Sequence, residues 1–279
     1  MSAQDAGAPL AAWRRCLDKI GVAFATLVRK PHIDPKRPWL LPRRELAIAA
    51  AVAIVVFVLG MLLIDGPTTR LVQRLPRWIV SFFDSITDYG KSGYVLWPLG
   101  LVFLVLAALP PLGSRMQQRV LAAIMVRVGF LFTAVALPGL FDTTIKRLIG
   151  RARPLVGGSL DPTLFHPFIW RSDYASLPSG HVTTSFALMV GVASLWPRAR
   201  TYALIYALMI AISRVVVTAH YPTDVAAGAV VGIVGAVMVR RWFAMRRLGF
   251  SFGPDGTPHQ YPGPSLKRIK AVARAVLAD

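Results

Sequence analysis

Between Leu46 and Ile64 the chain runs for 19 residues without a charged side chain. A helix needs about 20 predominantly apolar residues to cross the hydrocarbon core of a bilayer, so this run predicts a membrane-spanning helix. The composition agrees, because 55% of the 279 residues are hydrophobic and only 16% are charged. Charged residues make up about 25% of a typical soluble domain, which is well above this value.

The charged residues are strongly basic, with 32 Lys and Arg against 13 Asp and Glu and a net charge of +19. A soluble nucleic-acid-binding protein would share this charge but not the hydrophobicity. A secreted disulfide scaffold is excluded because Cys16 is the single cysteine. The hydrophobic content also excludes a disordered polar chain. We therefore predict an integral membrane protein that binds no nucleic acid.

Five further apolar stretches follow the first, and together they predict an all-α bundle of six transmembrane helices. The last stretch contains Gly228, Gly232 and Gly235, small residues that suit close helix contacts in lipid. The predicted organisation is an N-terminal segment (1–45), a six-helix membrane domain (46–243) and a C-terminal tail (244–279). The six predicted spans are Leu46–Ile64, Tyr94–Leu112, Val120–Phe141, His181–Trp196, Tyr202–Ala219 and Val225–Phe243.

Both terminal segments carry an amphipathic helical pattern. Such a helix lies either in the membrane interface or against the protein's own cytoplasmic face. No apolar core of a signal peptide follows the first charges. In the tail, a loop rich in helix breakers (Gly249–Pro264) precedes a predicted basic helix, Ser265–Ala278. The apolar face of the N-terminal helix would consist of Leu10, Trp13, Leu17, Ile20, Phe24 and Leu27.

The distribution of basic residues predicts the orientation in the membrane. With both termini in the cytoplasm, 21 of the 32 basic residues fall in cytoplasmic segments and nine in external loops. The positive-inside rule favours this arrangement. The remaining two, Arg127 and Arg214, lie within predicted spans. Arg127 is close enough to the cytoplasmic end of its span to reach the interface, which is our interpretation of it.

The loop between the third and fourth spans holds five of the nine external cations, against the general rule. Lys146 and Arg153 are seven residues apart, so on a continuing helix they would share one face. Two aligned cations at the membrane surface suit a multiply charged anion, or they contact lipid headgroups. Arg147 and Arg151 would lie on other faces, and we interpret them as headgroup or surface contacts. His166 is interpreted as a lid or interface residue.

Two further motifs fall at the same level of the predicted bundle. Ser179 and Gly180 open the fourth span, where a helix offers free backbone N–H groups and the positive end of its dipole to an anion. His181 follows in the first turn. The alternative is a plain helix cap with a histidine at the interface.

The third motif contains Arg214, a cation inside a span, which marks a functional site by default because a charge in lipid is costly. Asp224 follows His220 by four residues, and a carboxylate so placed can accept a ring N–H and orient the imidazole. A buried ion pair beside a surface histidine is the alternative. The predicted topology brings all three motifs together at the external ends of helices three to six.

These motifs resemble the signature of the type 2 phosphatidic acid phosphatases, a superfamily that also includes glucose-6-phosphatase and the vanadium haloperoxidases. All eleven signature residues are present in order, between about residues 141 and 231. The terminal segments lie outside the resemblance. The matching motifs are Lys146-x6-Arg153-Pro154, Pro178-Ser179-Gly180-His181 and Ser213-Arg214-x5-His220-x3-Asp224.

The resemblance implies a phosphohistidine mechanism that uses no metal or other cofactor. His220 would be the nucleophile, oriented by Asp224, and His181 the general acid and base. With one carboxylate expected in the site, the donors are too few for a Mg²⁺ cage. The remaining residues would bind the phosphate: Lys146, Arg153, Ser179, Gly180 and Arg214.

The resemblance also implies the substrate class and the location. The expected substrate is a lipid phosphate, taken from the bilayer at the external face of a bacterial inner membrane. Undecaprenyl diphosphate, phosphatidylglycerol phosphate, phosphatidic acid and a lipid A phosphate all fit. A lipid phosphotransferase on the same scaffold is an alternative, and a phospholipid transporter is another, although it leaves both histidines unexplained. The sequence does not predict the oligomeric state.

Overall fold

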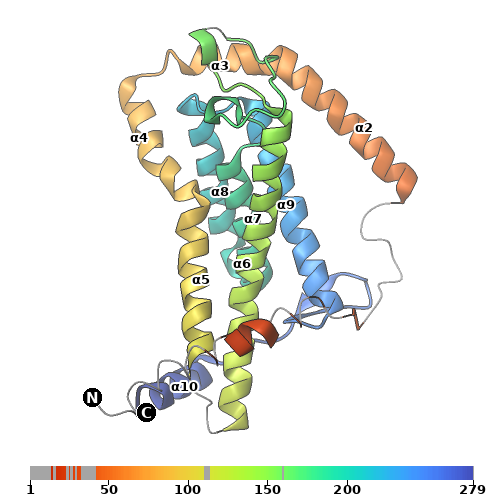
Figure 1. Cartoon of the computed structure of the whole chain (residues 1–279), viewed down its shortest axis with the longest axis vertical. Helices are drawn as coiled ribbons and strands as arrows, with labels where there is room; N and C mark the ends of the chain where they lie inside the picture. Colours follow the sequence, from red (N-terminus) through yellow and green to blue (C-terminus); the bar gives the residue numbers. More distant parts are fainter. Residues whose placement is uncertain are drawn as a thin grey trace. The chain divides into compact units, whose positions relative to one another are not determined.

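The chain is mostly helical (Figure 1). In a computed structural model of the whole chain we describe residues 14, 17–22, 25, 28, 30–32, 42–109, 114–158 and 160–278. The first apolar stretch forms α2 (Arg43–Gly60), which continues through the π-helical turn η1 (Met61–Asp65) into α3 (Gly66–Val72). The helices that follow are α4 (Arg77–Thr87), α5 (Ser92–Ala108), α6 (Arg115–Ile149), α7 (Gly180–Leu195), α8 (Arg200–Val216) and α9 (Pro222–Met245).

Five helical segments in the described part of the chain are long and apolar enough to cross a membrane. The fourth predicted span, α7, is apolar but has only 16 residues. The multi-pass membrane architecture is therefore confirmed, whereas a count of six spanning helices stays a prediction. The five long segments are Arg44–Val72, Arg77–Ala108, Arg115–Ile149, Pro197–Val216 and Pro222–Met245.

Several helices are longer than the apolar runs that predict them. Residues Arg77–Thr87 form the amphipathic helix α4, where the sequence predicts only an external loop. Short 3-10 turns connect some of these helices. One of them, η2 (Asp88–Gly90), links α4 to α5. The hydropathy pattern locates the apolar centre of a helix but misses polar turns at its ends, because those turns contain the charged residues.

The chain divides into two compact units, and helices α5, α6 and α9 contribute residues to both. The larger unit comprises Pro38–Val95 and Thr133–Met238. The smaller unit comprises Met1–Arg37, Leu96–Phe132 and Val239–Asp279. All the residues singled out by the three motifs belong to the larger unit.

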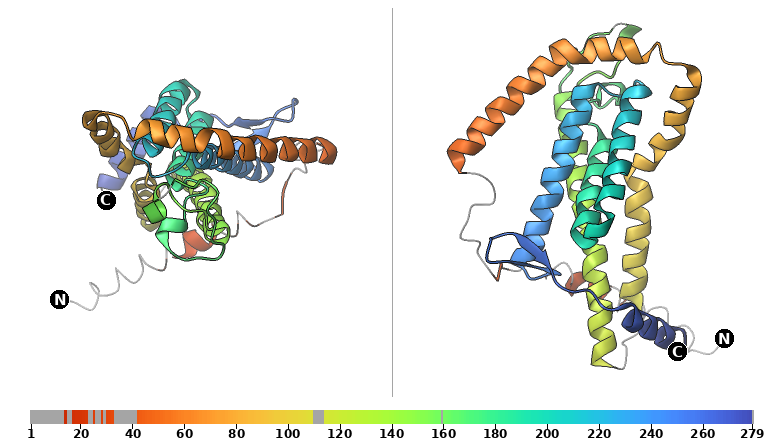
Figure 2. Two further views of the ribbon diagram at one scale, coloured as in Figure 1. Left: turned by 90° about the horizontal axis from the view of Figure 1, so that it is seen from above. Right: turned by 180° about the vertical axis from the view of Figure 1, so that it is seen from behind.

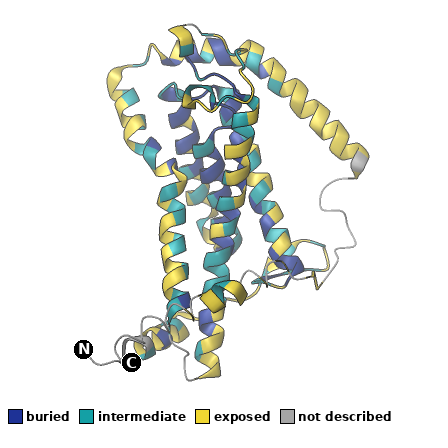
Figure 3. Cartoon of the chain, viewed as in Figure 1, coloured by how far each residue is buried: buried dark blue, intermediate teal, exposed yellow. Residues whose placement is uncertain are grey.

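In the larger unit α7 packs against α8 and against α9, and burial is concentrated on these helices (Figure 3). A Cβ atom at Gly228 of α9 would lie 2.6 Å from the carbonyl oxygen of Ser179. One at Gly232 would lie 2.5 Å from that of Thr183. Gly235 approaches Pro138 of α6 in the same way, so the predicted close helix contacts are confirmed.

Helix α2 contrasts with this buried core. It extends away from α7, α8 and α9 in the larger unit, and its side chains are mostly exposed (Figures 2 and 3). Val52, Ile54 and Val56 are among its exposed apolar residues. An apolar surface of this extent is unusual on a soluble protein, and it fits a helix that faces lipid.

The smaller unit contains the C-terminal tail, part of which differs from the prediction. The expected loop Gly249–Pro264 contains an antiparallel hairpin of β1 (Phe250–Phe252) and β2 (Pro258–Gln260). Phe250 is buried with its ring centroid 4.7 Å from that of Phe130. Strands are predicted from alternating apolar and polar residues, and three-residue strands with one buried apolar side chain show too little of this alternation.

The predicted basic helix is present as α10 (Leu266–Ala278). Its buried Val272 joins Val120 and Leu121 of α6 in one apolar cluster, so this helix packs on the protein itself. Nη2 of Arg127 donates to the carbonyl oxygen of Tyr261 in the tail at 2.9 Å, and the interpretation that this side chain reaches the cytoplasmic interface stays a prediction. Residues 17–22 are helical as predicted. Leu10, Trp13, Phe24 and Leu27 of the predicted N-terminal face lie outside the described residues.

Candidate active site

Arg153 lies in a loop, so the predicted helix through Lys146 and Arg153 is wrong. Helix α6 ends at Ile149, and Gly150 has φ +64°, a conformation that glycine adopts without strain. A Cβ atom at Gly150 would lie 1.7 Å from the carbonyl oxygen of His166. The loop is then held by backbone hydrogen bonds, one of which joins the Arg153 N–H to the Asp173 carbonyl at 2.8 Å.

Lys146 occupies the last turn of α6 and forms an ion pair one turn back, where Asp142 accepts from Nζ at 2.6 Å. Asp142 is buried and also accepts from the Thr183 hydroxyl of α7 at 3.1 Å. The ammonium lies beside Gly180, since a Cβ atom there would be 3.0 Å from Nζ. Lys146 therefore reaches the start of α7, as the motif predicts, but with an unexpected acidic partner.

The start of α7 presents neutral donors to the same place. Ser179 is the N-cap residue, and its N–H donates to the Asp224 carbonyl at 3.1 Å, which ties α7 to α9. The Ser179 hydroxyl is buried and has no partner within the described ranges. The N–H groups of the first turn, that of Gly180 included, have no acceptor within their own helix. His181 follows in that turn and is partly buried.

Arg214 lies buried near the end of α8. Its Nη1 donates to the Thr87 hydroxyl at 2.7 Å, so the end of α4 orients the guanidinium. Its Nε finds no acceptor among residues that the structure describes. After α8 the chain turns back through Thr218 (φ +54°), and the His220 N–H reaches the Arg214 carbonyl at 3.2 Å.

His220 is 3% exposed, and its ring is oriented by a backbone carbonyl. Nδ1 lies 2.8 Å from the carbonyl oxygen of Ser176. A carbonyl oxygen only accepts, so Nδ1 carries the hydrogen and Nε2 keeps its lone pair. The carboxylate of Asp224 lies 3.9 Å from Nδ1, beyond hydrogen-bond distance. The direct contact that the sequence predicts is therefore replaced by one through Ser176.

Burial lowers the pKa of His220 to about 4 from its usual 6.5. The neighbouring Asp224 opposes this shift, whereas the cations Arg214 and Arg153 add to it. At neutral pH the imidazole is accordingly uncharged and Nε2 is available as a nucleophile. Arg153 and Arg214 thus act on the same group although they come from different elements.

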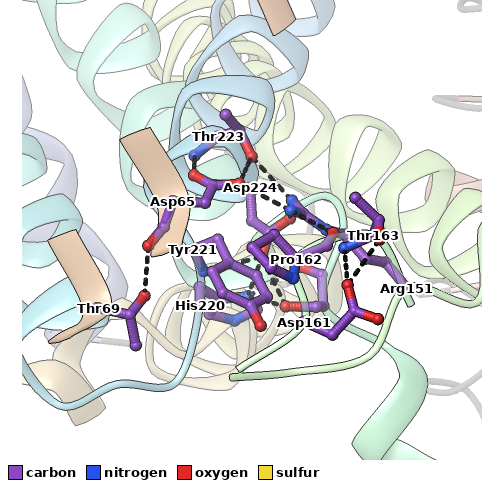
Figure 4. A network of polar contacts seen from close by, with 11 residues as sticks. Asp65, Thr69, Arg151, Asp161, Pro162, Thr163, His220, Tyr221, Thr223 and Asp224 are labelled. Atoms are coloured by element: carbon purple, nitrogen blue, oxygen red, sulfur yellow. Dashed lines mark hydrogen bonds and ion pairs between the residues drawn. The ribbon is translucent and has the colours of Figure 1, made fainter. Parts of the chain in front are cut away.

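Asp224, in the first turn of α9, is fully buried and bonded on all sides (Figure 4). Its carboxylate accepts from the Ser176 hydroxyl at 2.6 Å and from the Tyr221 N–H at 2.9 Å. The third donor is Arg151, whose Nη1 lies 2.5 Å from Oδ1. Arg151 has no exposed surface, so its interpretation as a headgroup or surface contact is wrong.

The sequence misses three acidic or polar members of this region, namely Asp65, Asp142 and Ser176. Asp65 ends the uncharged run of the first span, and Asp142 precedes Lys146 by one helical turn. Both positions carry a signal, since an acid at membrane depth and an acid four residues from a lysine each predict a partner. Ser176 contacts His220 through its backbone carbonyl, which side-chain patterns do not show, and it contacts Asp224 through its hydroxyl.

The expectation of one carboxylate in the site is also wrong, because Asp65, Asp142 and Asp224 all lie there. Asp142 is paired with Lys146, while Asp65 and Asp224 are paired with Arg151. Within the described ranges no three His, Cys, Asp or Glu side chains form a group that could hold a metal ion. Metal independence stays a prediction, and it no longer rests on the number of acids.

Comparison with known proteins gives the family. The PAP2 superfamily profile matches residues 127–248. A lipid A 1-phosphatase of Rhizobium johnstonii is 33% identical over 202 residues, which cover 72% of this chain and 82% of that protein. A lipid A 1-phosphatase of Rhizobium etli is 33% identical over 201 residues, covering 72% and 86%.

Two solved structures are similar at lower identity. The crystal structure of Aquifex aeolicus LpxE has a TM-score of 0.46 and 21% identity, covering 62% of this chain and 92% of that one. The PAP2-type phosphatidylglycerolphosphate phosphatase from Bacillus subtilis has a TM-score of 0.44 and 17% identity, covering 69% and 94%.

The motifs and the apolar helices define a membrane-embedded phosphatase. The chain belongs to the type 2 phosphatidic acid phosphatase (PAP2) superfamily. It is an enzyme that hydrolyses phosphoric monoesters, and its class is that of the lipid phosphate phosphatases.

Proposed function

We propose that this enzyme removes phosphate from a lipid phosphate or diphosphate without a metal, through a phosphohistidine formed on His220. The observation that carries the proposal is the hydrogen bond from Nδ1 of His220 to the Ser176 carbonyl. It leaves Nε2 as the nucleophilic nitrogen of a neutral ring, in the field of Arg153 and Arg214.

In the first step Nε2 of His220 attacks phosphorus, and the bond from phosphorus to the lipid oxygen breaks. His181 donates its proton to that oxygen, so the lipid leaves as an alcohol or, from a diphosphate, as a monophosphate. Nδ1 keeps its hydrogen bond to Ser176 throughout, and the nearby Asp224 carboxylate stabilises the positive charge that develops on the ring.

In the second step water attacks the phosphorus of the phosphohistidine, and the bond to Nε2 breaks. His181 accepts the proton of the attacking water, which returns both histidines to their starting states. In both steps Lys146, Arg153 and Arg214 would stabilise the equatorial oxygens, whose charge peaks in the transition state. The Ser179 hydroxyl and the Gly180 N–H would add neutral donors.

The substrate we favour is the 1-phosphate of lipid A, because the relatives in two Rhizobium species are lipid A 1-phosphatases. Undecaprenyl diphosphate, phosphatidylglycerol phosphate and phosphatidic acid remain in the proposal as the other lipid phosphates to compare. The excess of basic residues in the terminal segments supports cytoplasmic termini and an active site at the periplasmic face of an inner membrane.

The test offers the detergent-purified enzyme these four lipids and measures released phosphate, with and without EDTA. We expect release from lipid A 1-phosphate, no loss in EDTA, and no release by His220→Ala. His259→Ala is the matched control, since this histidine is exposed on the β2 strand, and it should behave as wild type.

Three outcomes would overturn parts of the proposal separately. Phosphate release by His220→Ala would remove the phosphohistidine. Inhibition by EDTA that Mg²⁺ reverses would remove metal independence. If the substrate loses its phosphate only when a second lipid is added, and the phosphate is found on that second lipid, the enzyme is a phosphotransferase.

A further inference from the structure

Arg151 is enclosed by protein on all sides, at the junction of three separate segments (Figure 4). Nε and Nη2 donate to the Pro162 carbonyl at 3.0 and 2.9 Å. Nη2 also donates to Asp65 at 2.7 Å, and Nη1 donates to Thr223 and Asp224 at 2.8 and 2.5 Å. An arginine has five N–H donors, and every one of them has an acceptor here.

Because its donors are all used, Arg151 has none left for a phosphate. Its guanidinium also stacks on the ring of Tyr221, with Cζ 4.5 Å from the centroid. Arg153, two residues further on, instead keeps a buried Nε without a partner among the described residues. The geometry therefore separates a cation that can receive the substrate from one that is part of the framework.

Asp65 connects this framework to the first membrane helix. Its Oδ1 accepts from the Thr223 N–H at 3.0 Å, and its Oδ2 accepts from the Thr223 hydroxyl at 2.6 Å. The N–H groups in the first turn of a helix lack intrahelical acceptors, so Asp65 caps α9 from a distant segment. That same turn contains Asp224, and both carboxylates meet on Arg151.

We propose that Asp65 and Arg151 are positioning residues of the catalytic centre, through which the first membrane helix holds Asp224 and thereby His220. Arg151 holds one carboxylate oxygen of Asp224, which turns the other oxygen towards Ser176 and His220. An isolated acid-base pair would lack this constraint. The inference rests on the proposed role of His220 as nucleophile.

The test compares Asp65→Asn, Arg151→Met and Arg151→Lys in the full-length protein in detergent. We expect Arg151→Met to lower kcat by about 100-fold, because small displacements of reacting groups cost that much, with a smaller change in KM. Arg151→Lys should restore little of the lost kcat, since an ammonium group cannot donate the five hydrogen bonds that the guanidinium makes. Asp65→Asn should lie between Arg151→Met and wild type.

A pH profile distinguishes positioning from a merely structural role. His220 is faced by Asp224 of α9, Arg214 of α8, His181 of α7 and Arg153 of the loop, with Arg151 and Asp65 behind Asp224. Protonation of His220 stops its attack, so the pKa of His220 contributes to the acid limb of kcat/KM. Arg151→Met removes a positive charge, which should raise this pKa and move the acid limb to higher pH. Asp65→Asn removes a negative charge and should move that limb to lower pH.

The matched control is Thr69→Val. The Thr69 hydroxyl is buried and donates to the Asp65 carbonyl, so its loss weakens the same segment without touching Arg151 or Asp224. This variant should leave the acid limb in place. If Asp65→Asn and Arg151→Met also leave it in place, or move it in the same direction, the inference fails. Activity that survives in His220→Ala would instead overturn the proposed function.

Discussion

Arg151 and Arg153 stand two residues apart in one loop, yet the fold uses them in opposite ways. Arg151 has no exposed surface, and its five donors are satisfied by protein acceptors. Arg153 is only partly buried, and its Nε has no partner among the residues described. Arg151 is paired with two buried carboxylates, and Arg153 is the cation that we propose binds the phosphate.

The same division extends across the active site. We call Asp65, Arg151 and Asp224 the support side, and Lys146, Arg153 and Arg214 the binding side. Substitutions on the binding side should reduce transition-state stabilisation, because these cations are proposed to bind the phosphate. Replacing Arg153 should leave the fold intact, whereas Lys146 is also paired with the buried Asp142 and Arg214 is itself buried. Substitutions on the support side should lower stability as well, because removing one partner of a buried ion pair leaves an uncompensated charge.

The largest effect is expected on the binding side. Arg153→Met should lower kcat/KM by about 10²–10³-fold, the usual cost of removing one preorganised donor to a developing negative charge. Its melting temperature should stay near that of wild type. Steady-state phosphate release and a thermal melt of the same preparation check both expectations.

The matched control for this variant is Arg171→Met. Arg171 is an exposed arginine in the same polar region, paired only at the surface with Asp173. It should keep wild-type kcat/KM. If Arg153→Met stays within about three-fold of wild type, Arg153 does not belong to the binding side, since even one neutral donor is worth more than that.

A second variant acts on both sides at once. Gly150→Ala forces a side chain into a positive-φ position and against the His166 carbonyl, which should cost about 3 kcal/mol in strain. Because Gly150 begins the loop that carries both arginines, stability and kcat should fall together. Gly139→Ala, where a Cβ atom meets nothing within 4 Å, is the control and should melt no lower than wild type, because Ala favours a helix interior over Gly. An unchanged melting temperature in Gly150→Ala would contradict this.

The binding side could be predicted from the sequence much better than the support side. Lys146, Arg153, Arg214 and His220 are recognisable because their types and spacings are those of a known signature, and a cation within a span is conspicuous. The structure brings Arg153 and Arg214 into the field of His220, although the helix expected to carry Arg153 ends before it.

On the support side Asp224 belongs to the signature, but its pairing with Arg151 and Asp65 could not be predicted, because these partners are far apart in sequence. Asp65 and Thr223 are joined by hydrogen bonds across 158 residues, and no local period relates them. Arg151 resembles any other basic residue flanking a span until its burial is known. For the same reason the hairpin in the tail is missed, since its only buried anchor, Phe250, packs on the distant Phe130.

A smaller effect tests whether activity merely follows stability. Val272→Ala in α10 removes two buried carbons from its contact with Val120 and Leu121, at about 0.8 kcal/mol each. We expect a lower melting temperature and unchanged kcat/KM, because this cluster lies in the smaller unit. The exposed Leu266→Ala of the same helix should change neither quantity. A fall in kcat/KM with Val272→Ala would show that activity follows stability, and it would contradict the separation of catalytic effects from stability effects on which the two sides are defined.

The smallest effect concerns His220, which lies between the two sides. Its pKa of about 4 is set mainly by burial, with Asp224 on the support side raising it and the cations Arg214 and Arg153 lowering it. With an ordinary pKa near 6.5 the ring would be about 90% protonated at pH 5.5 and unable to attack. With the lowered pKa only roughly 3% is protonated there, so the loss due to His220 should be less than two-fold between pH 7 and 5.5.

The kcat/KM of Arg153→Met divided by that of wild type, measured at each pH, isolates the titration of His220. Ionisation of the substrate phosphate is common to both enzymes and cancels in this ratio. Removing a cation that lowers the pKa of His220 should raise it, so the ratio should fall as the pH decreases towards 4. A ratio that is flat, or that rises on acidification, would show that the charge of Arg153 does not reach His220.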